Sequence, residues 1–266
     1  MFQSQPAQAR EHPITPNESA VFKETQQGDL KLNIFKPKEE STSPRPAIVF
    51  FFGGGWYGGN PGQFFPHAEL LAKHGIVGLT AEYRVEKRHG TDPRKSVEDG
   101  KSAMRWIRAH ANELGVDPNQ IIAGGGSAGG HVAATTAFIT DFDSPNDDLT
   151  VSPVPNALVL FNPVVDNGPD GYGYDRVKDY WEAFSPMHNI GENPPPTVFM
   201  LGTKDELIPV SVAENFKKGI EENGGICEVH LYEDQPHGFF NFSNRENYNA
   251  TTAHMLAFLK AHGFIE

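Results

Sequence analysis

The amino-acid sequence predicts an α/β fold in which helices flank one mostly parallel sheet. Short apolar runs alternate along the chain with longer segments of helical spacing, an order typical of parallel sheets because each crossover between parallel strands carries a helix. Hydrophobic residues make up 38% of the 266 residues, enough for one buried core of ordinary domain size. The 27 glycines and 21 prolines indicate many sharp loops between the elements.

The first half of the chain supplies three strands and two helices. Residues 30–35 alternate with a period of two, and residues 47–52 form a continuous apolar run typical of a strand covered on both faces. Residues 64–74 indicate a short helix, which a strand over 76–81 follows. A helix over 93–114 begins at an Asp-Pro pair, carries apolar residues at helical spacing and stops at a glycine.

The second half continues the same alternation. We expect strands over 120–123, 157–161, 197–201 and 227–232, and helices over 128–139, 211–222 and 248–262. No repeat or low-complexity tract interrupts this order, so one sheet accounts for all the strands.

The same pattern predicts the domain organisation. We expect an N-terminal extension over 1–27 and a single domain over 28–266, without a large separate cap domain. Residues 162–196 are the longest irregular stretch, rich in Pro, Gly and aromatic residues. A stretch of that length inside a compact domain is usually functional, and we expect a substrate-facing loop or a small cap.

Composition excludes several classes of partner. The net charge of −12 argues against nucleic acid, which needs a clustered positive surface. No run of about 18 apolar residues predicts a membrane span. The single cysteine, Cys227, lies in an apolar alternation and is expected in the core. Residues 7–9, Ala-Gln-Ala, resemble the end of a signal cleavage site, so we expect a secreted or periplasmic protein and leave a cytoplasmic one open.

The motif that points most directly to catalysis is Gly125-Gly126-Ser127-Ala128-Gly129. It matches G-x-S-x-G and lies between a short apolar strand and an Ala-rich helix. A nucleophilic serine needs this context, because the turn must be tight and its neighbours small. The helix N-terminus also places free N–H groups beside developing negative charge. The alternative interpretation is a glycine-rich turn that only lets the helix pack closely on the strand.

His237 is the candidate base that would activate this serine. It follows the last predicted strand and precedes a glycine, so it lies at the same carboxyl edge of the sheet as Ser127. Most other histidines lie on predicted helices or beside polar residues. His131, on the first turn of the helix after Ser127, is expected to pack near the site.

Asp205 is the candidate acid that would orient the imidazole. It follows the predicted strand 197–201, and the chain order Ser, Asp, His suits side chains that come from successive strand ends. Asp166, after the preceding strand, is the main rival, and Glu206 and Asp234 are further alternatives.

A glycine triplet predicts an oxyanion hole. Gly53-Gly54-Gly55 directly follows the strand 47–52, and glycines let backbone N–H groups turn toward a carbonyl oxygen. We expect the donors to be the N–H groups of Gly54, Gly55 and Ala128.

The same loop also matches a dinucleotide-binding pattern. Residues 53–58 satisfy G-x-G-x-x-G, and Glu82 ends the next strand as a ribose-binding acid would. Such a site requires a helix to start at the loop, but residues 58–62 read Gly-Gly-Asn-Pro-Gly, which disfavours a helix. We therefore favour the oxyanion hole.

With these residues in place, the chain resembles the esterase and lipase branch of α/β-hydrolases related to hormone-sensitive lipase. It is most similar to short members that resemble acetyl-xylan esterases and feruloyl esterases. The matching stretches are 51–59, 81–84, 117–130, 162–163, 202–209 and 237–239. The resemblance implies an α/β-hydrolase fold, an acyl-enzyme, short acyl groups, and neither cofactor nor metal. It departs at Phe52, where the family motif usually opens with histidine, so another group must brace the loop.

The sequence thus predicts a carboxylesterase that removes short acyl groups, most plausibly acetyl, from carbohydrate or similar esters. Aromatic side chains that could stack on a sugar are Trp56, Tyr57, Phe240 and Trp181, with Tyr172 and Tyr174 in the loop 162–196. A short-chain lipase, a feruloyl esterase, a peptidase similar to prolyl oligopeptidases and a non-catalytic binding protein are the alternatives. A homo-oligomer is compatible with the sequence.

Overall fold

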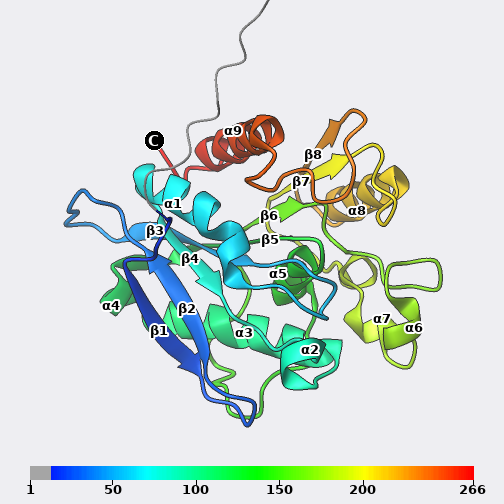
Figure 1. The fold of residues 1–266 in the computed structure, drawn as a ribbon, viewed down its shortest axis with the longest axis horizontal. Helices are drawn as coiled ribbons and strands as arrows, with labels where there is room; N and C mark the ends of the chain where they lie inside the picture. Colours follow the sequence, from blue (N-terminus) through cyan, green and yellow to red (C-terminus); the bar gives the residue numbers. More distant parts are fainter. Residues whose placement is uncertain (1–12) are drawn as a thin grey trace, which may run out of the picture.

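The computed structural model describes residues 13–266, which build one eight-stranded sheet with helices on both faces (Figure 1). The signal-like motif at 7–9 lies outside the described residues. The strands are β1 (Glu18–Lys23), β2 (Leu30–Phe35), β3 (Arg45–Phe51), β4 (Val77–Ala81), β5 (Val116–Gly126), β6 (Ala157–Phe161), β7 (Thr197–Gly202) and β8 (Cys227–Tyr232). They lie in the order β1-β2-β4-β3-β5-β6-β7-β8. Strands β3 to β8 are parallel, and β1 and β2 join antiparallel at one edge. The predicted α/β-hydrolase fold with a mostly parallel sheet is confirmed.

Two apolar layers cover the sheet. One contains α1 (Phe65–Lys73) and α9 (Arg245–Ala261), and the other contains α3 (Pro93–Ala109), α5 (Ala128–Phe138) and α8 (Val210–Glu222). The alternation of side chains along β3 supplies both layers. Ile48 and Phe50 point toward α1, while Val49 and Phe51 point toward the opposite layer. Central strands buried on both faces explain why 47–52 is a continuous apolar run.

The N-terminal boundary predicted at residue 28 is wrong, because β1 belongs to the same sheet. Its apolar pattern is weak, since only Phe22 is buried and the strand lies at an edge. Charged groups anchor it instead. Lys23 Nζ lies 2.9 Å from Glu98 and 2.8 Å from Asp99, and Arg84 binds both of these carboxylates. Tertiary ion pairs, which no local pattern reveals, thus attach residues 18–23 to α3.

The other predicted elements are present with small changes. The helix over 93–114 divides at His110 into α3 and α4 (Ala111–Leu114), and β5 runs on through three glycines. Glycine disfavours strands by itself, but the Phe50 ring occupies the space beside Gly124. The structure also contains short helices that the apolar periodicity of the sequence did not predict: η1 (Pro61–Phe64), α2 (Glu86–His89), α6 (Tyr174–Val177), α7 (Trp181–Phe184) and η2 (Pro186–Asn189). Across residues 13–266, no helix combines the length and the apolar character that crossing a membrane requires.

Helix α5 approaches the sheet more closely than any side chain would permit. A Cβ on Gly129 would lie 2.1 Å from the carbonyl oxygen of Phe51 and 2.3 Å from that of Phe52. A Cβ on Gly125 would lie 2.4 Å from the carbonyl oxygen of Gly129. These neighbours are backbone atoms and have no rotamer to change. The contact places the N-terminus of α5 at the carboxyl edge of β3 and β5.

A buried histidine lies in the layer of α1. His67 is fully buried among aromatic rings, and neither ring nitrogen has a hydrogen-bond partner within the described residues. Burial lowers the pKa of His67 to about 3, so the imidazole is neutral in the folded protein at neutral pH.

We predict that Gly129→Ala destabilises the protein by about 3 kcal/mol or more, because the new methyl group overlaps fixed carbonyl oxygens. Urea unfolding measures the change. The control Gly191→Ala, where nothing lies within 4 Å of the added Cβ, should stay within about 0.5 kcal/mol of wild type. Equal stabilities of the two variants would contradict the close approach of α5.

We predict that His67→Phe weakens the acid sensitivity of folding. The unfolded chain takes up a proton near pH 6.5 that the folded chain binds only near pH 3, so the free energy of unfolding falls as the pH drops through this interval. Between pH 7 and pH 5 the wild type should lose about 2 kcal/mol more than the variant. Urea unfolding at both pH values checks this, and parallel losses would refute it.

Candidate active site

Ser127 lies in a strained turn between β5 and α5. Its φ is 55° and its ψ is −124°, a conformation that costs a residue with a side chain about 1–3 kcal/mol. Backbone hydrogen bonds hold the turn. The Ser127 N–H donates to the carbonyl of Phe161 at 3.0 Å, and the Ser127 carbonyl accepts from the N–H groups of His131 and Val164 at 3.1 Å. The strain directs the hydroxyl away from the sheet and into a cleft.

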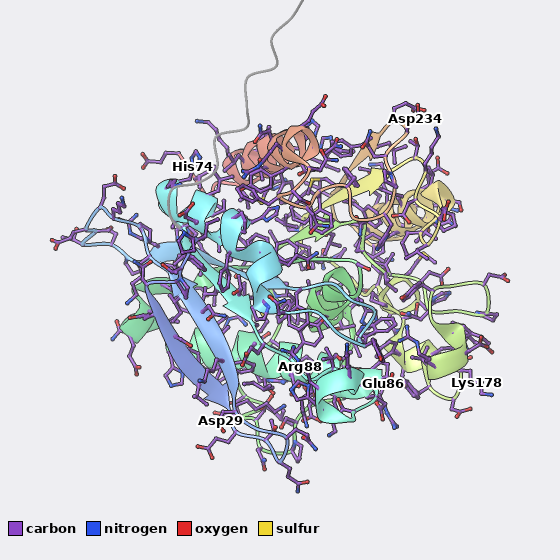
Figure 2. The ribbon with its side chains drawn as sticks, viewed as in Figure 1. Asp29, His74, Glu86, Arg88, Lys178 and Asp234 are labelled. Atoms are coloured by element: carbon purple, nitrogen blue, oxygen red, sulfur yellow. The ribbon has the colours of Figure 1, made fainter. Side chains whose placement is uncertain are left out.

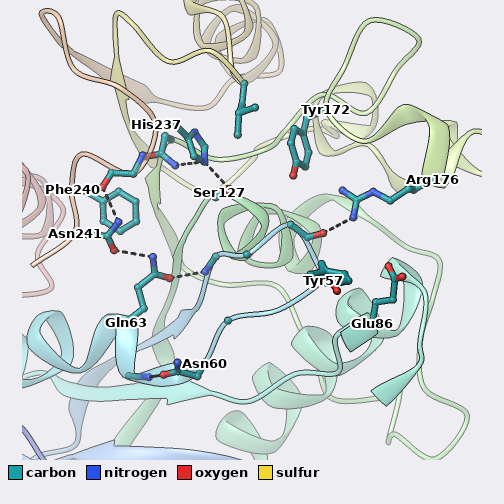
Figure 3. Close-up of a pocket in the computed structure, with 18 residues that line it drawn as sticks. Tyr57, Asn60, Gln63, Glu86, Ser127, Tyr172, Arg176, His237, Phe240 and Asn241 are labelled. Carbon is teal, nitrogen blue, oxygen red and sulfur yellow. Dashed lines mark hydrogen bonds between the residues drawn. The ribbon is translucent and has the colours of Figure 1, made fainter. Parts of the chain in front are cut away.

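His237 lies between Ser127 and Asp205 in one hydrogen-bonded line (Figure 3). Its Nε2 lies 2.8 Å from Ser127 Oγ, and its Nδ1 lies 2.7 Å from Asp205 Oδ2. The three side chains come from the ends of β8, β5 and β7, which meet at one edge because the strands are parallel. Residues that lie far apart in the sequence thus meet as the sequence analysis expected.

The surroundings of Asp205 define the orientation of the imidazole. The Asp205 side chain is fully buried, and its Oδ1 accepts the N–H groups of Leu207 and Ile208 at 2.9 Å each. Oδ2 is then left to accept from Nδ1–H of His237. With its proton on Nδ1, the ring presents an unprotonated Nε2 to the serine hydroxyl, as a general base requires.

The rival acids lie in other contacts. Asp166 accepts the N–H of Gly168 at 2.8 Å, and Glu206 is exposed. Asp234 pairs with Lys204 at 2.8 Å and projects at the outer edge of the molecule (Figure 2). None of the three is hydrogen-bonded to His237 within residues 13–266, so only Asp205 has the geometry of the third member.

His131 packs beside the site as expected. Its ring contacts Trp56 and Phe184 at centroid distances of 4.9 and 4.3 Å. Burial is the main cause that lowers the pKa of His131 to about 3, so this imidazole is a neutral packing element.

The glycine loop after β3 lines the cleft with its backbone. Gly54 has φ +128° and Gly55 has φ +64°, and the Gly54 carbonyl accepts from the N–H groups of Tyr57 and Gly58. The N–H groups of Gly54 and Gly55 find no acceptor within the part of the chain that the structure describes. Ala128 begins α5, so its N–H is among those that a helix leaves unpaired. All three predicted donors therefore lie at the mouth of the Ser127 turn.

Tyr83 and Gln63 hold the oxyanion loop near Phe52, the position at which related motifs carry histidine. The Phe52 ring stacks on Tyr83 at 4.1 Å, and the Tyr83 hydroxyl donates to the Phe52 carbonyl at 2.5 Å. The Gly53 N–H donates to Gln63 Oε1 at 2.7 Å. Phe52 thus contributes packing, while neighbouring side chains supply the polar contacts.

The cleft above Ser127 has a volume of about 1100 Å³. Ser127 and His237 lie in its lining together with the glycines at 53–55. Polar side chains around them are Asn60, Gln63, Glu86, Asn162, Arg176 and Asn241. Leu207, Phe240 and the rings of Tyr57 and Tyr172 also line it, so the cleft presents both polar and apolar groups to a substrate.

The aromatic residues expected to bind substrate divide into two groups. Tyr57 and Phe240 line the cleft. Trp56 does not, because its positive φ of 58° turns the ring inward, where it is 1% exposed and packs against Tyr172. Trp181 also lies outside the lining and packs edge-on against His188. The predicted stacking of a sugar on Trp56 is therefore wrong, because the ring is buried, and Trp181 is not part of the cleft.

Tyr172 of the loop 162–196 lines the cleft, whereas Tyr174 of the same loop does not. Several polar residues of the site have roles that their position in the sequence did not reveal. Asn162 is buried with φ +34°, its Oδ1 accepts the Gly238 N–H at 3.0 Å, and its Nδ2 lies 3.3 Å from His237 Nε2. Arg176 donates to the Gly55 carbonyl at 2.7 Å. The Asn-Pro pair after β6 was the one sequence signal that pointed to Asn162. The amides of Gln63 and Asn241 follow no sequence spacing that is diagnostic of an active site.

Within residues 13–266, no group of three or more His, Cys, Asp or Glu side chains is arranged to hold a metal ion.

Comparison with known proteins agrees with this geometry. The BD-FAE family model matches residues 32–169, more than half of the chain, and the dienelactone hydrolase family model matches residues 172–264. Esterase LipC of Mycobacterium tuberculosis is 28% identical over 205 residues, which cover 70% of this chain and 50% of LipC. The chain thus spans about half the length of LipC and of other curated relatives that it matches.

Solved structures of a thermophilic esterase, Est2 of Thermogutta terrifontis, match almost the whole chain. The propionate-bound form is 41% identical, with a TM-score of 0.90 over 95% of this chain and 96% of that chain. The form phosphorylated by paraoxon is 42% identical, with a TM-score of 0.88 over 93% and 95% of the two chains. A butyrate-bound form is 40% identical, with a TM-score of 0.89 over 95% and 96%. The chain therefore belongs to the BD-FAE family of α/β-hydrolase-fold serine esterases.

Proposed function

We propose that the protein is a carboxylesterase that removes acetyl and other short acyl groups from carbohydrates or similar polyhydroxylated alcohols, with Ser127, His237 and Asp205 as its catalytic residues. The observation that carries the proposal is the hydrogen-bonded line of these three side chains at a cleft whose lining includes several polar side chains.

Acylation begins at Ser127. Its Oγ attacks the ester carbonyl carbon while His237 Nε2, 2.8 Å away, takes the hydroxyl proton. Asp205 keeps the other ring proton on Nδ1 and stabilises the imidazolium. The tetrahedral intermediate then collapses, the bond to the alcohol oxygen breaks, and the imidazolium returns its proton to that oxygen. The same base activates water in the second half-reaction, which releases the carboxylic acid and restores the serine.

The negative charge of both tetrahedral intermediates falls on the former carbonyl oxygen. The N–H groups of Gly54, Gly55 and Ala128 are placed to bind it, and α5 adds the positive end of its dipole. Loss of one such donor typically slows an acyl transfer by about 10²–10³.

Two observations support the substrate class. The Thermogutta esterase has been solved with propionate and with butyrate, which are short acids. In this chain the amide of Asn60 and the charged groups of Glu86 and Arg176 line the cleft and could bind hydroxyl groups of a sugar.

We predict that Ser127→Ala lowers kcat for p-nitrophenyl acetate by about 10⁴-fold or more and leaves the melting temperature close to that of wild type. Asp205→Asn should lower kcat by about 10⁴-fold, because the amide favours the wrong imidazole tautomer. Exposed Ser211→Ala is the control and should keep full activity. More than a few per cent of wild-type activity in Ser127→Ala would refute the assignment, and so would failure of a fluorophosphonate to label Ser127.

We also predict a steep dependence on acyl length. Among acetyl, butyryl, octanoyl and feruloyl esters of one alcohol, kcat/KM should be highest for acetyl or butyryl and lowest for octanoyl. Acetylated xylan should release acetate, while peptide amides should stay intact. Fastest turnover of the octanoyl ester would indicate a lipase, fastest turnover of the feruloyl ester a feruloyl esterase, and cleavage of the amide a peptidase.

A further inference from the structure

Two side-chain amides connect the loop that carries the oxyanion donors with the loop that carries His237 (Figure 3). The Gly53 N–H donates to Gln63 Oε1 at 2.7 Å, and Gln63 Nε2 donates to Asn241 Oδ1 at 2.9 Å. Asn241 Nδ2 donates in turn to the carbonyl of Gly238 at 2.7 Å. An unbroken chain of hydrogen bonds therefore joins Gly53, which precedes Gly54, to Gly238, which follows His237.

Every amide in this path has a defined orientation. A backbone N–H only donates, so Gln63 must present its oxygen to Gly53 and its nitrogen to Asn241. Asn241 must then present its oxygen to Gln63 and its nitrogen to the Gly238 carbonyl. Reversal of either amide would place two donors or two acceptors face to face, so both amides orient together.

The oxyanion loop needs support from outside itself. Three consecutive glycines have little intrinsic preference for one conformation, and the N–H groups that bind the oxyanion must stay unpaired in the free protein. Phe52, at the position where related motifs carry histidine, stacks on Tyr83 and offers the loop no polar side-chain group. Gln63 accepts the Gly53 N–H, the one N–H of the triplet that has an acceptor within the described residues.

The histidine loop is held at Gly238 on both of its backbone groups. Asn162 Oδ1 accepts the Gly238 N–H at 3.0 Å, and Asn241 donates to its carbonyl through both the side chain at 2.7 Å and the backbone N–H at 3.2 Å. With φ +78°, Gly238 forms the bend directly after the imidazole. A displacement of Asn241 would therefore move His237 relative to Asp205.

We propose that Gln63 and Asn241 are a pair of positioning residues that couple the oxyanion hole to the general base, so that the N–H groups of Gly54 and Gly55 and the His237 imidazole are correctly placed together. The inference rests on the proposed function. Neither amide reaches Ser127 Oγ or the imidazole through a hydrogen bond within the described residues, so both act through the loops that they hold.

A double-mutant cycle with shape-conserving variants tests the coupling. Gln63→Met and Asn241→Leu each remove the polar contacts and keep the approximate side-chain size. Each should lower kcat for p-nitrophenyl acetate by about tenfold to a hundredfold, because small misplacements in an active site have effects of this size, and should change KM little. The double variant should resemble the slower single variant, because the first substitution already breaks the path.

Two further readouts separate positioning from a purely structural role. Gln63→Met should move the pH profile of kcat/KM toward lower pH, although residue 63 does not contact His237, because a looser contact with the Asp205 carboxylate stabilises the imidazolium less. Gln63→Glu keeps an acceptor for the Gly53 N–H but sets a carboxylate oxygen against Asn241 Oδ1, so it breaks the path and should lose kcat as Gln63→Met does. If Gln63→Met unfolds, the pH profile of Asn241→Leu supplies the same test.

The control is Gln120→Met, the same substitution on a half-buried glutamine near the amino end of β5, and it should keep wild-type kinetics. Losses that multiply in the double variant, an unchanged pH profile or a change in KM alone would overturn the coupling. These outcomes differ from a failure of the proposed function, in which wild type would hydrolyse no ester or Ser127→Ala would stay active.

Discussion

The close approach of α5 to the ends of β3 and β5 is the constraint on which the site depends. Because Gly125 and Gly129 carry no side chains, the helix lies directly on the backbone of Phe51 and Phe52. That contact forces the chain through a strained turn at Ser127 and places the unpaired N–H of Ala128 beside the oxyanion loop. A wider separation would move the nucleophile and one oxyanion donor away from the groups that complete the site.

The reacting groups are held by hydrogen bonds that come from other parts of the molecule. The Ser127 turn depends on the carbonyl of Phe161, the Asp205 carboxylate on the N–H groups after it, and the oxyanion loop on Tyr83 and Gln63. Short loops with many glycines provide the N–H groups that the chemistry needs but cannot hold a single conformation alone. Their order is therefore a property of the assembled carboxyl edge of the sheet.

The position of Phe52 illustrates how a change in one residue is absorbed by its surroundings. A histidine there could both pack and form hydrogen bonds, whereas Phe52 only packs, on the ring of Tyr83. The polar contacts are made instead by the Tyr83 hydroxyl and the Gln63 amide. Arg176 adds a contact to the Gly55 carbonyl from the segment 162–196, so that segment supports the oxyanion loop as well as lining the cleft.

The sequence by itself determined the fold class, most of the elements and the residues that carry the chemistry, because apolar periodicity and the glycine-flanked serine are local signals. Only the tertiary structure decided that β1 joins the sheet, since ion pairs to Glu98 and Asp99 attach it, and that Trp56 turns into the core. The positions of His237 and Asp205 after strands made them candidates, but only the hydrogen bond from His237 to Asp205 decided between Asp205 and Asp166. The amides of Gln63, Asn162 and Asn241 escaped notice for the same physical reason: a hydrogen bond between residues far apart in the chain leaves no periodic trace in the sequence.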